Sequence, residues 1–171
     1  MDCHQSCFPK LPNNRGQSLN ASVGGFLFNF QHPKHLVALV INTRQLVQNN
    51  AAEIVRLRKQ ILETLPYRDK GPKQLAEWSA ACTEFHDQYE SLAFPGGTLS
   101  ARRRMRAGNQ EAIEYGIAFL EVRPYFFRSG YMYQEYMRVL RNCPLSKSQR
   151  HRYDRIREKY MIYRENCRRS P

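Results

Sequence analysis

The stretch LAEWSAACTEFHDQYESL, residues 75–92, decides the fold class of this chain. Its large apolar side chains recur after three residues and then after four, in strict alternation, with no proline or glycine between them. The members of this row are Leu75, Trp78, Cys82, Phe85, Tyr89 and Leu92. Such spacing places them all on one face of an α-helix, the face that packs against other helices. The stretch therefore predicts an amphipathic helix of a bundle, ended by FPGG at residues 94–97.

A longer helix is predicted before it, over about residues 36–65. Apolar residues recur there with the helical period, and the next proline or glycine is Pro66. The residues of this apolar face are Val40, Val47, Ile54, Leu57, Ile61 and Leu65. Residues 1–34 show neither a helical nor a strand period and are rich in Pro, Asn, Gly and Ser, so we expect a flexible leader there. The predicted organisation is this leader followed by one helical-bundle domain, residues 35–169.

Two further helices are predicted over residues 100–122 and from Pro124 onward. The first carries the cluster RRRMR, residues 102–106, near its start, where arginines oppose the helix dipole. The second begins at Pro124 because the proline ring suits the first turn of a helix.

The last helix opens with the sequence PLSKSQ, residues 144–149. Ser146 at the N-cap and Gln149 three positions later match a capping box, in which each side chain bonds the other residue's backbone N–H. An apolar stripe is predicted along this helix at the same three-and-four spacing, formed by Gln149, Tyr153, Ile156, Tyr160, Tyr163 and Cys167. No strand pattern occurs after residue 35. The sequence therefore predicts an all-α fold, a bundle of about five helices with a disordered or loosely packed leader.

The segment VRPYFFRSGYMYQEY, residues 122–136, concentrates aromatic and cationic side chains. One interpretation is a corner between two helices, in which Arg128 is a buried anchor that reaches Glu121 and Gly130 allows close approach of another backbone. The other is an exposed surface that stacks aromatic groups and contacts phosphates. The candidate residues of this corner are Pro124, Phe126, Phe127, Arg128, Gly130 and Tyr131.

Residues 119–153, which contain FFRSGY followed by PLSKSQR, resemble the C-terminal half of small helical bacterial proteins of an uncharacterised family. The resemblance implies an all-helical fold. It implies no activity, catalytic residue or cofactor.

The formal net charge is +12, and residues 121–171 hold 13 Lys and Arg against 5 Asp and Glu. A basic surface of this kind can bind phosphate backbones without reading bases, although a charged helix face is commonly only solvated. No helix-turn-helix, RRM, KH or zinc-finger pattern accompanies the charge. The candidate nucleic-acid-binding residues are Arg102, Arg103, Arg104, Arg106, Arg150, Arg152, Arg155, Arg157, Lys159 and Arg164.

Catalytic motifs are sparse. The pair His86–Asp87 in FHDQY is typical of helical metal-dependent phosphohydrolases, and it is the weakest of the hypotheses considered. No G-x-S-x-G, P-loop or G-x-G-x-x-G sequence occurs, so we predict no catalytic residue, cofactor or metal site. The spacing of Cys3, Cys7, His32 and His35 does not match structural zinc sites.

Five scattered cysteines favour reduced thiols and a cytoplasmic protein. The longest aliphatic run, LVALVI at residues 36–41, is too short to span a bilayer, so no membrane partner is predicted. The sequence thus favours a non-enzymatic binding module that contacts a protein partner or a second copy of itself. The alternative is a sequence-nonspecific RNA- or DNA-binding protein that uses its basic C-terminal third.

Overall fold

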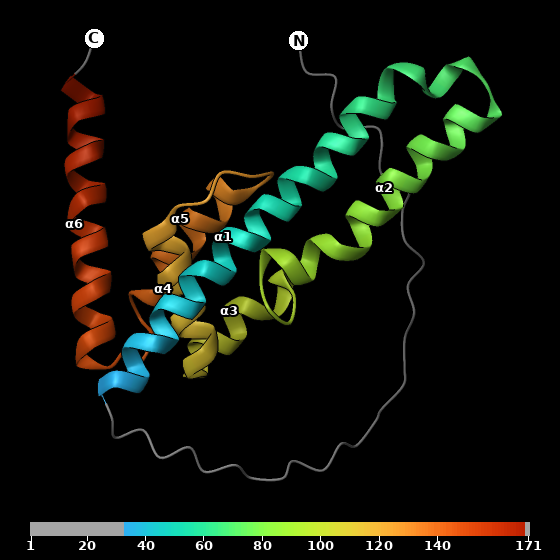
Figure 1. Ribbon diagram of the computed structural model, residues 1–171. Helices are drawn as coiled ribbons and strands as arrows, with labels where there is room; N and C mark the ends of the chain where they lie inside the picture. The colour runs from blue at the N-terminus through green and yellow to red at the C-terminus, as the bar shows by residue number, and fades with distance from the viewer. Residues whose placement is uncertain (1–32, 170–171) are drawn as a thin grey trace, which may run out of the picture. The chain divides into compact units, whose positions relative to one another are not determined.

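The structure, a computed structural model, describes residues 33–169, with side chains from Asn42 onward. This part of the chain contains six α-helices, one 3-10 helix and no strand (Figure 1). The elements are α1 (Pro33–Thr64), η1 (Leu65–Lys70), α2 (Pro72–Ala93), α3 (Thr98–Arg106), α4 (Gln110–Val122), α5 (Ser129–Leu140) and α6 (Lys147–Arg169). The all-α prediction is confirmed. Residues 1–32 of the predicted leader, with the Cys and His residues at positions 3, 7 and 32, lie outside the described residues, and its last two residues begin α1.

The helices α1 and α2 form a hairpin closed by η1, and they lie side by side along much of their length (Figure 1). Near the other helices this hairpin buries Ile54, Leu57 and Phe85. Towards η1 it has little cover, since Leu62 is 55% exposed and Leu75 is 49% exposed. The predicted apolar rows are therefore core positions only in the half of the hairpin that α4 contacts.

The helix α4 lies at the centre of the core. Every residue from 112 to 120 is buried, and α4 packs against α1, α3, α5 and α6. Gly116 permits this packing, because a Cβ at that position would lie 3.1 Å from the sulfur of Met105 and 3.4 Å from a methyl of Leu140. A short contact of that kind leaves little room for a side chain.

The predicted helix over residues 100–122 is wrong as a single element, because it breaks between α3 and α4. Gly108 has φ +80, and the Asn109 side chain caps α4 by accepting a hydrogen bond from the Ala112 amide at 2.8 Å. Glycine reaches positive φ without strain and asparagine is a strong N-cap, so the two together favour the break. As a result Arg103, Arg104 and Arg106 of this cluster fall in the last turn of α3, where a cation interacts favourably with the helix dipole.

The start of the next helix was also predicted wrongly. Pro124 lies in a non-helical link, and α5 begins at Ser129, whose hydroxyl accepts a hydrogen bond from the Phe126 amide at 3.1 Å. Arg123 and Arg128, at the two ends of this link, have φ of +49 and +66. These two left-handed residues turn the chain between α4 and α5 without a proline-led helix.

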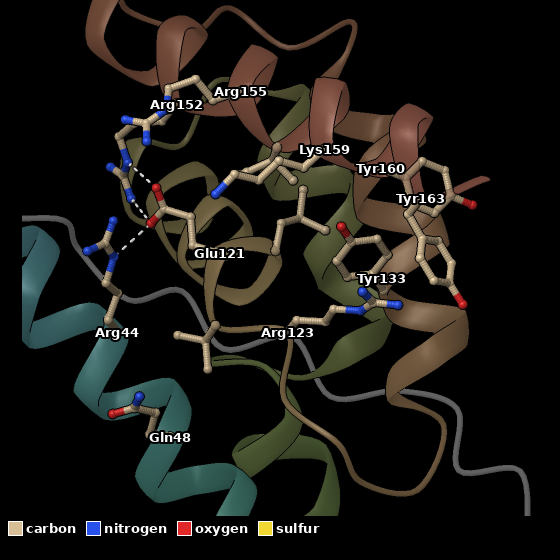
Figure 2. A pocket seen from close by; sticks show the side chains of 13 residues that line it. Arg44, Gln48, Glu121, Arg123, Tyr133, Arg152, Arg155, Lys159, Tyr160 and Tyr163 are labelled. Atoms are coloured by element: carbon tan, nitrogen blue, oxygen red, sulfur yellow. Dashed lines mark hydrogen bonds and ion pairs between the residues drawn. The ribbon is translucent and has the colours of Figure 1, made fainter. Parts of the chain in front are cut away.

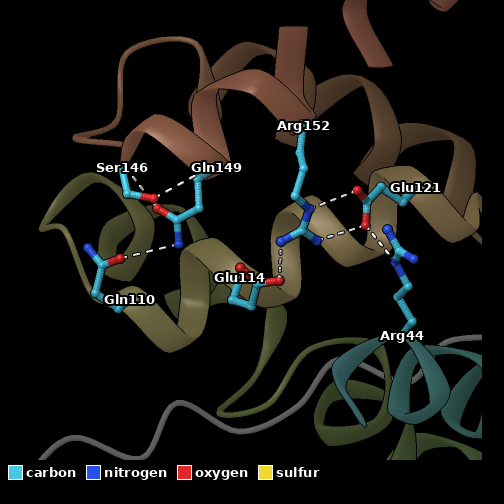
Figure 3. A network of polar contacts seen from close by, with 7 residues as sticks. All are labelled: Arg44, Gln110, Glu114, Glu121, Ser146, Gln149 and Arg152. Atoms are coloured by element: carbon cyan, nitrogen blue, oxygen red, sulfur yellow. Dashed lines mark hydrogen bonds and ion pairs between the residues drawn. The ribbon is translucent and has the colours of Figure 1, made fainter. Parts of the chain in front are cut away.

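The capping box of α6 is confirmed. The Ser146 amide donates to the Gln149 side-chain oxygen at 3.1 Å, and the Gln149 amide donates to the Ser146 hydroxyl at 3.3 Å (Figure 3). The first half of α6 then buries Tyr153 and Ile156, while Met161 and the residues after it are exposed. The predicted apolar stripe of this helix therefore holds for its first half only. Among the described helices, none is long and apolar enough to cross a membrane.

Candidate functional site

A pocket of about 620 Å³ opens between α1, α4, α5 and α6 (Figure 2). Among the described residues, its polar lining consists of cations and tyrosines with a single carboxylate and the amide of Gln48. The cations are Arg44, Arg123, Arg152, Arg155 and Lys159, the carboxylate is Glu121, and the tyrosines are Tyr133, Tyr160 and Tyr163. The cationic groups outnumber the anionic ones in this partly enclosed pocket. Walls of low dielectric constant strengthen the positive electrostatic potential that such an excess produces.

One end of the pocket is a network of ion pairs (Figure 3). Arg152 donates from Nε and Nη2 to the two oxygens of Glu121 at 2.9 and 2.7 Å, and from Nη1 to Glu114 at 2.5 Å. Arg44 also donates to Glu121, at 2.8 Å. The network therefore connects α6, α4 and α1 through two carboxylates of one helix.

Two members of this network, Glu121 and Arg152, remain charged at neutral pH. Burial by itself would raise the pKa of Glu121, but hydrogen bonds from Arg152 and Arg44 lower it below the usual value. Burial would likewise lower the pKa of Arg152, and its hydrogen bonds to Glu121 and Glu114 raise it instead. The negative charge of Glu121 is thus balanced by Arg44 and Arg152. Both of these arginines are already paired within the protein.

The other three cations of the pocket, Arg123, Arg155 and Lys159, make no ion pair within residues 42–169. Arg123 instead lies over two aromatic rings, 5.5 Å from the centroid of Tyr133 and 5.2 Å from that of Tyr163. Rings hold a guanidinium in place through the cation–π attraction without neutralising its charge. The pocket therefore presents three cations whose charge the surrounding described residues leave uncompensated.

The tyrosines form the other end of the pocket. The rings of Tyr133 and Tyr160 lie 5.9 Å apart, and the guanidinium of Arg164 lies 5.9 Å from the Tyr160 ring. Burial raises the pKa of Tyr133, against the opposing effect of the Arg123 charge, so its hydroxyl stays protonated at neutral pH. This end offers aromatic surface and hydroxyl donors.

Three of the ten predicted basic candidates line the pocket: Arg152, Arg155 and Lys159. Of the others on α6, Arg157 is exposed on the helix surface and Arg164 contacts Tyr160. Arg150 donates to the backbone carbonyls of Arg141 and Cys143 at 3.4 and 3.3 Å, so it fastens the turn before α6.

The arginines of α3 lie elsewhere, because α3 supplies no residue to this pocket. Arg102 pairs with Glu135 at 3.1 Å, and Arg104 donates to the Pro95 carbonyl and pairs with Glu111. Arg103 and Arg106 are exposed. The structure thus separates the basic residues that share a pocket from those that brace a loop or face solvent.

The aromatic corner divides between core and surface. Phe126 is buried, and Phe127 packs edge-on against Phe85 and lies under the guanidinium of Arg58. Arg128 and Tyr131 are exposed, so the prediction of a buried Arg128 anchor is wrong. No ion pair joins Arg128 to Glu121, whose oxygens bond Arg44 and Arg152.

The expected close approach at Gly130 is also wrong. No heavy atom would lie within 4 Å of a Cβ added there, and Gly130 is exposed. Pro124 is half-buried in the link before α5.

Sequence reasoning missed Arg44, Arg123 and Tyr133, and it assigned Tyr160 and Tyr163 to the core. Arg44 meets Glu121 across 77 positions, a distance over which local patterns carry no information. One available signal was the pair Glu114 and Glu121, two acidic residues seven positions apart and therefore on one face of a helix whose residues between them are largely apolar. Carboxylates withdrawn from water require cationic partners, so this pair pointed to arginines from other helices.

His86 and Asp87 are both exposed on α2. Within the described residues, no group of three or more His, Cys, Asp or Glu side chains is arranged to hold a metal ion. The carboxylates of the pocket network are likewise paired with arginines. The metal-dependent phosphohydrolase hypothesis gains no support from this arrangement.

Comparisons with known proteins give no relative on which to base a function. No protein-family model matches the chain, and searches of curated proteins and of solved structures found no match.

Proposed function

We propose that this protein is a non-enzymatic binding module for nucleic acid and that the pocket between α1, α4, α5 and α6 is its binding site. The observation that carries the proposal is the set of three cations, Arg123, Arg155 and Lys159, that line one pocket without an ion pair in the described part of the chain. Such a set of cations attracts the phosphate groups of a polyanionic partner.

The chemistry of the lining supports binding in preference to catalysis. Among the described lining residues the only carboxylate is Glu121, which is held by Arg44 and Arg152 and is therefore a poor proton acceptor. Burial raises the pKa of Tyr133, so its hydroxyl remains a hydrogen-bond donor at neutral pH. A lining of this composition holds an anion and lacks a general base.

A further cation continues the positive surface along α6 beyond the pocket. Arg164 is exposed, and its guanidinium lies over the ring of Tyr160, which lines the pocket. A polyanion longer than the pocket can therefore contact α6 over more than one turn. This extension favours a strand with repeated phosphates over a small isolated anion.

Fluorescence anisotropy with labelled mixed-sequence RNA and DNA tests the proposal. We expect binding at about 50 mM salt that weakens by orders of magnitude by about 200 mM. The double variant Arg155→Gln, Lys159→Gln should bind at least about tenfold more weakly at the low salt concentration. Absence of binding by the unmodified protein at low salt would contradict the proposal.

A second candidate function is self-association or binding of a protein partner through the η1 end of the hairpin. Leu62, Leu75 and Tyr67 are about half exposed there, and the indole N–H of Trp78 is buried without a hydrogen-bond partner among the described residues. Exposed apolar side chains grouped in this way favour an interface. Sedimentation velocity over a wide concentration range tests it. A species that stays monomeric throughout would rule out self-association.

A further inference from the structure

We infer that the tyrosine end of the pocket stacks an unpaired nucleobase, so that the protein prefers single-stranded RNA or DNA to duplex. This inference rests on the proposed function and names the form of nucleic acid that the same site takes.

The pocket has two chemically different ends (Figure 2). Glu121 lies at one end with Arg44 and Arg152, Arg123 lies at the other end with the tyrosines, and Lys159 lies between them. A nucleotide has the same division, a phosphate attached through a sugar to a planar ring. Its phosphate fits beside Lys159 and Arg155, and its base then falls at the tyrosine end.

The tyrosine end is a ready-made stacking platform. The Arg123 guanidinium lies over the rings of Tyr133 and Tyr163, at 5.5 and 5.2 Å, and Tyr133 lies 5.9 Å from Tyr160. Single-stranded bases stack both on aromatic rings and on the planes of arginine guanidinium groups. Because the cation and the rings already contact one another, a base can add to the stack without first ordering the side chains.

The platform is open to a ligand. Tyr163 is 50% exposed, and the volume of the pocket falls within the range of small-molecule sites. A base in a duplex is already stacked between its neighbours and cannot enter such a pocket without being unpaired. Duplex DNA can therefore reach the cations of α6 but gains nothing from the tyrosines.

The experiment compares five labelled probes of equal charge at one low salt concentration, by anisotropy. They are oligo-dT and oligo-rU of about 12 nucleotides, an abasic oligomer of the same length, a duplex and polyglutamate. We expect oligo-dT and oligo-rU to bind alike and at least about tenfold more tightly than the abasic oligomer and the duplex. Equal binding of the abasic and base-bearing oligomers, or equal binding of polyglutamate, would overturn the inference.

Two variants separate stacking from charge. Tyr163→Leu removes an exposed ring, and Arg123→Lys keeps the charge but loses the planar guanidinium. Both should lower the ratio of the affinities for base-bearing and abasic strands, because each variant removes a stacking surface and neither removes a charge. The matched controls are Tyr125→Leu and Tyr131→Leu, exposed tyrosines outside the pocket, which should change neither quantity.

The outcomes also distinguish the two proposals. If none of the nucleic-acid probes binds, the proposed function is wrong and the inference falls with it. If all the nucleic-acid probes bind with equal affinity, and Tyr163→Leu changes that affinity no more than the control variants do, the proposed function stands and only the stacking inference is wrong.

Discussion

Arg152 of α6 forms a two-pronged ion pair with Glu121 of α4, through hydrogen bonds of 2.9 and 2.7 Å to the two carboxylate oxygens. A third hydrogen bond of the same guanidinium reaches the buried Glu114. This arginine therefore fastens α6 to the core helix. Its neighbours Arg155 and Lys159, further along the same helix, point into the pocket without such partners in the described residues.

Arg152→Met should destabilise the protein by about 3–5 kcal/mol, because it leaves the buried Glu114 carboxylate without its cation and the half-buried Glu121 with Arg44 alone. Urea denaturation measures the loss. Arg155→Met is the matched control, since its exposed side chain makes no ion pair in the described part of the chain, and its effect should stay within about 0.5 kcal/mol. A loss below about 1 kcal/mol for Arg152→Met would show that the network does not hold α6.

Glu121 should make the stability depend on pH in the acid range. Its pKa is lower in the folded than in the unfolded protein, so the folded protein binds fewer protons as the carboxylate titrates. The stabilisation is therefore complete above the unfolded pKa, about 4.3, and is lost as the pH falls through the folded value. The melting temperatures of the unmodified protein and of Glu121→Gln should differ most at neutral pH and converge in acid. A difference in melting temperature that stays constant with pH would contradict the claim that the ionised Glu121 carboxylate stabilises the fold.

Two glycines should respond oppositely to alanine. Gly108→Ala should lose about 1–2 kcal/mol, because φ is +80 and an added Cβ would lie 3.2 Å from the ring of Pro144. Gly130→Ala should gain up to about 1 kcal/mol, because Gly130 is in a helix with nothing within 4 Å of an added Cβ. Thermal denaturation of both variants measures the pair. A change of stability with the same sign in both variants would mean that the break between α3 and α4, or the start of α5, is misplaced.

The capping box should be worth a measurable part of the stability of α6. Ser146→Ala removes the acceptor of the Gln149 amide and should cost about 0.5–2 kcal/mol. Ser148→Ala, at an exposed position in the first turn of the same helix, serves as the control and should be nearly neutral. Chemical denaturation of the two variants distinguishes the cap from a general loss of serine hydroxyls.

The features that the sequence predicted correctly depend on residues close to one another in the chain. The α1–α2 hairpin and the Ser146–Gln149 box follow from spacing and capping within a few residues. The break before α4 was missed because apolar residues continue with helical spacing from Met105 to Ala112 across it. There the left-handed Gly108 and the Asn109 cap outweigh the hydrophobic period.

The pocket was beyond sequence reasoning for a different reason. Its walls come from four helices, and the contact between Arg44 and Glu121 spans 77 positions. The charge run of α6 was recognised, but nothing local separates Arg152, which is paired, from Arg155, which is not. That difference arises only because α4 places Glu114 and Glu121 beside the second turn of α6, which carries Arg152.

The most direct test of the central claim is the salt dependence of single-stranded RNA binding for two double variants that remove the same charge. One is Arg155→Gln, Lys159→Gln, inside the pocket, and the other is Lys147→Gln, Arg157→Gln, exposed on the same helix outside it. A plot of log affinity against log salt concentration has a negative slope. We predict that the first double variant makes this slope shallower by about 1.4, the value for two lost phosphate contacts on a single strand, and that the second changes it far less. Equal slopes for the two variants would contradict the claim that the pocket cations form the binding site.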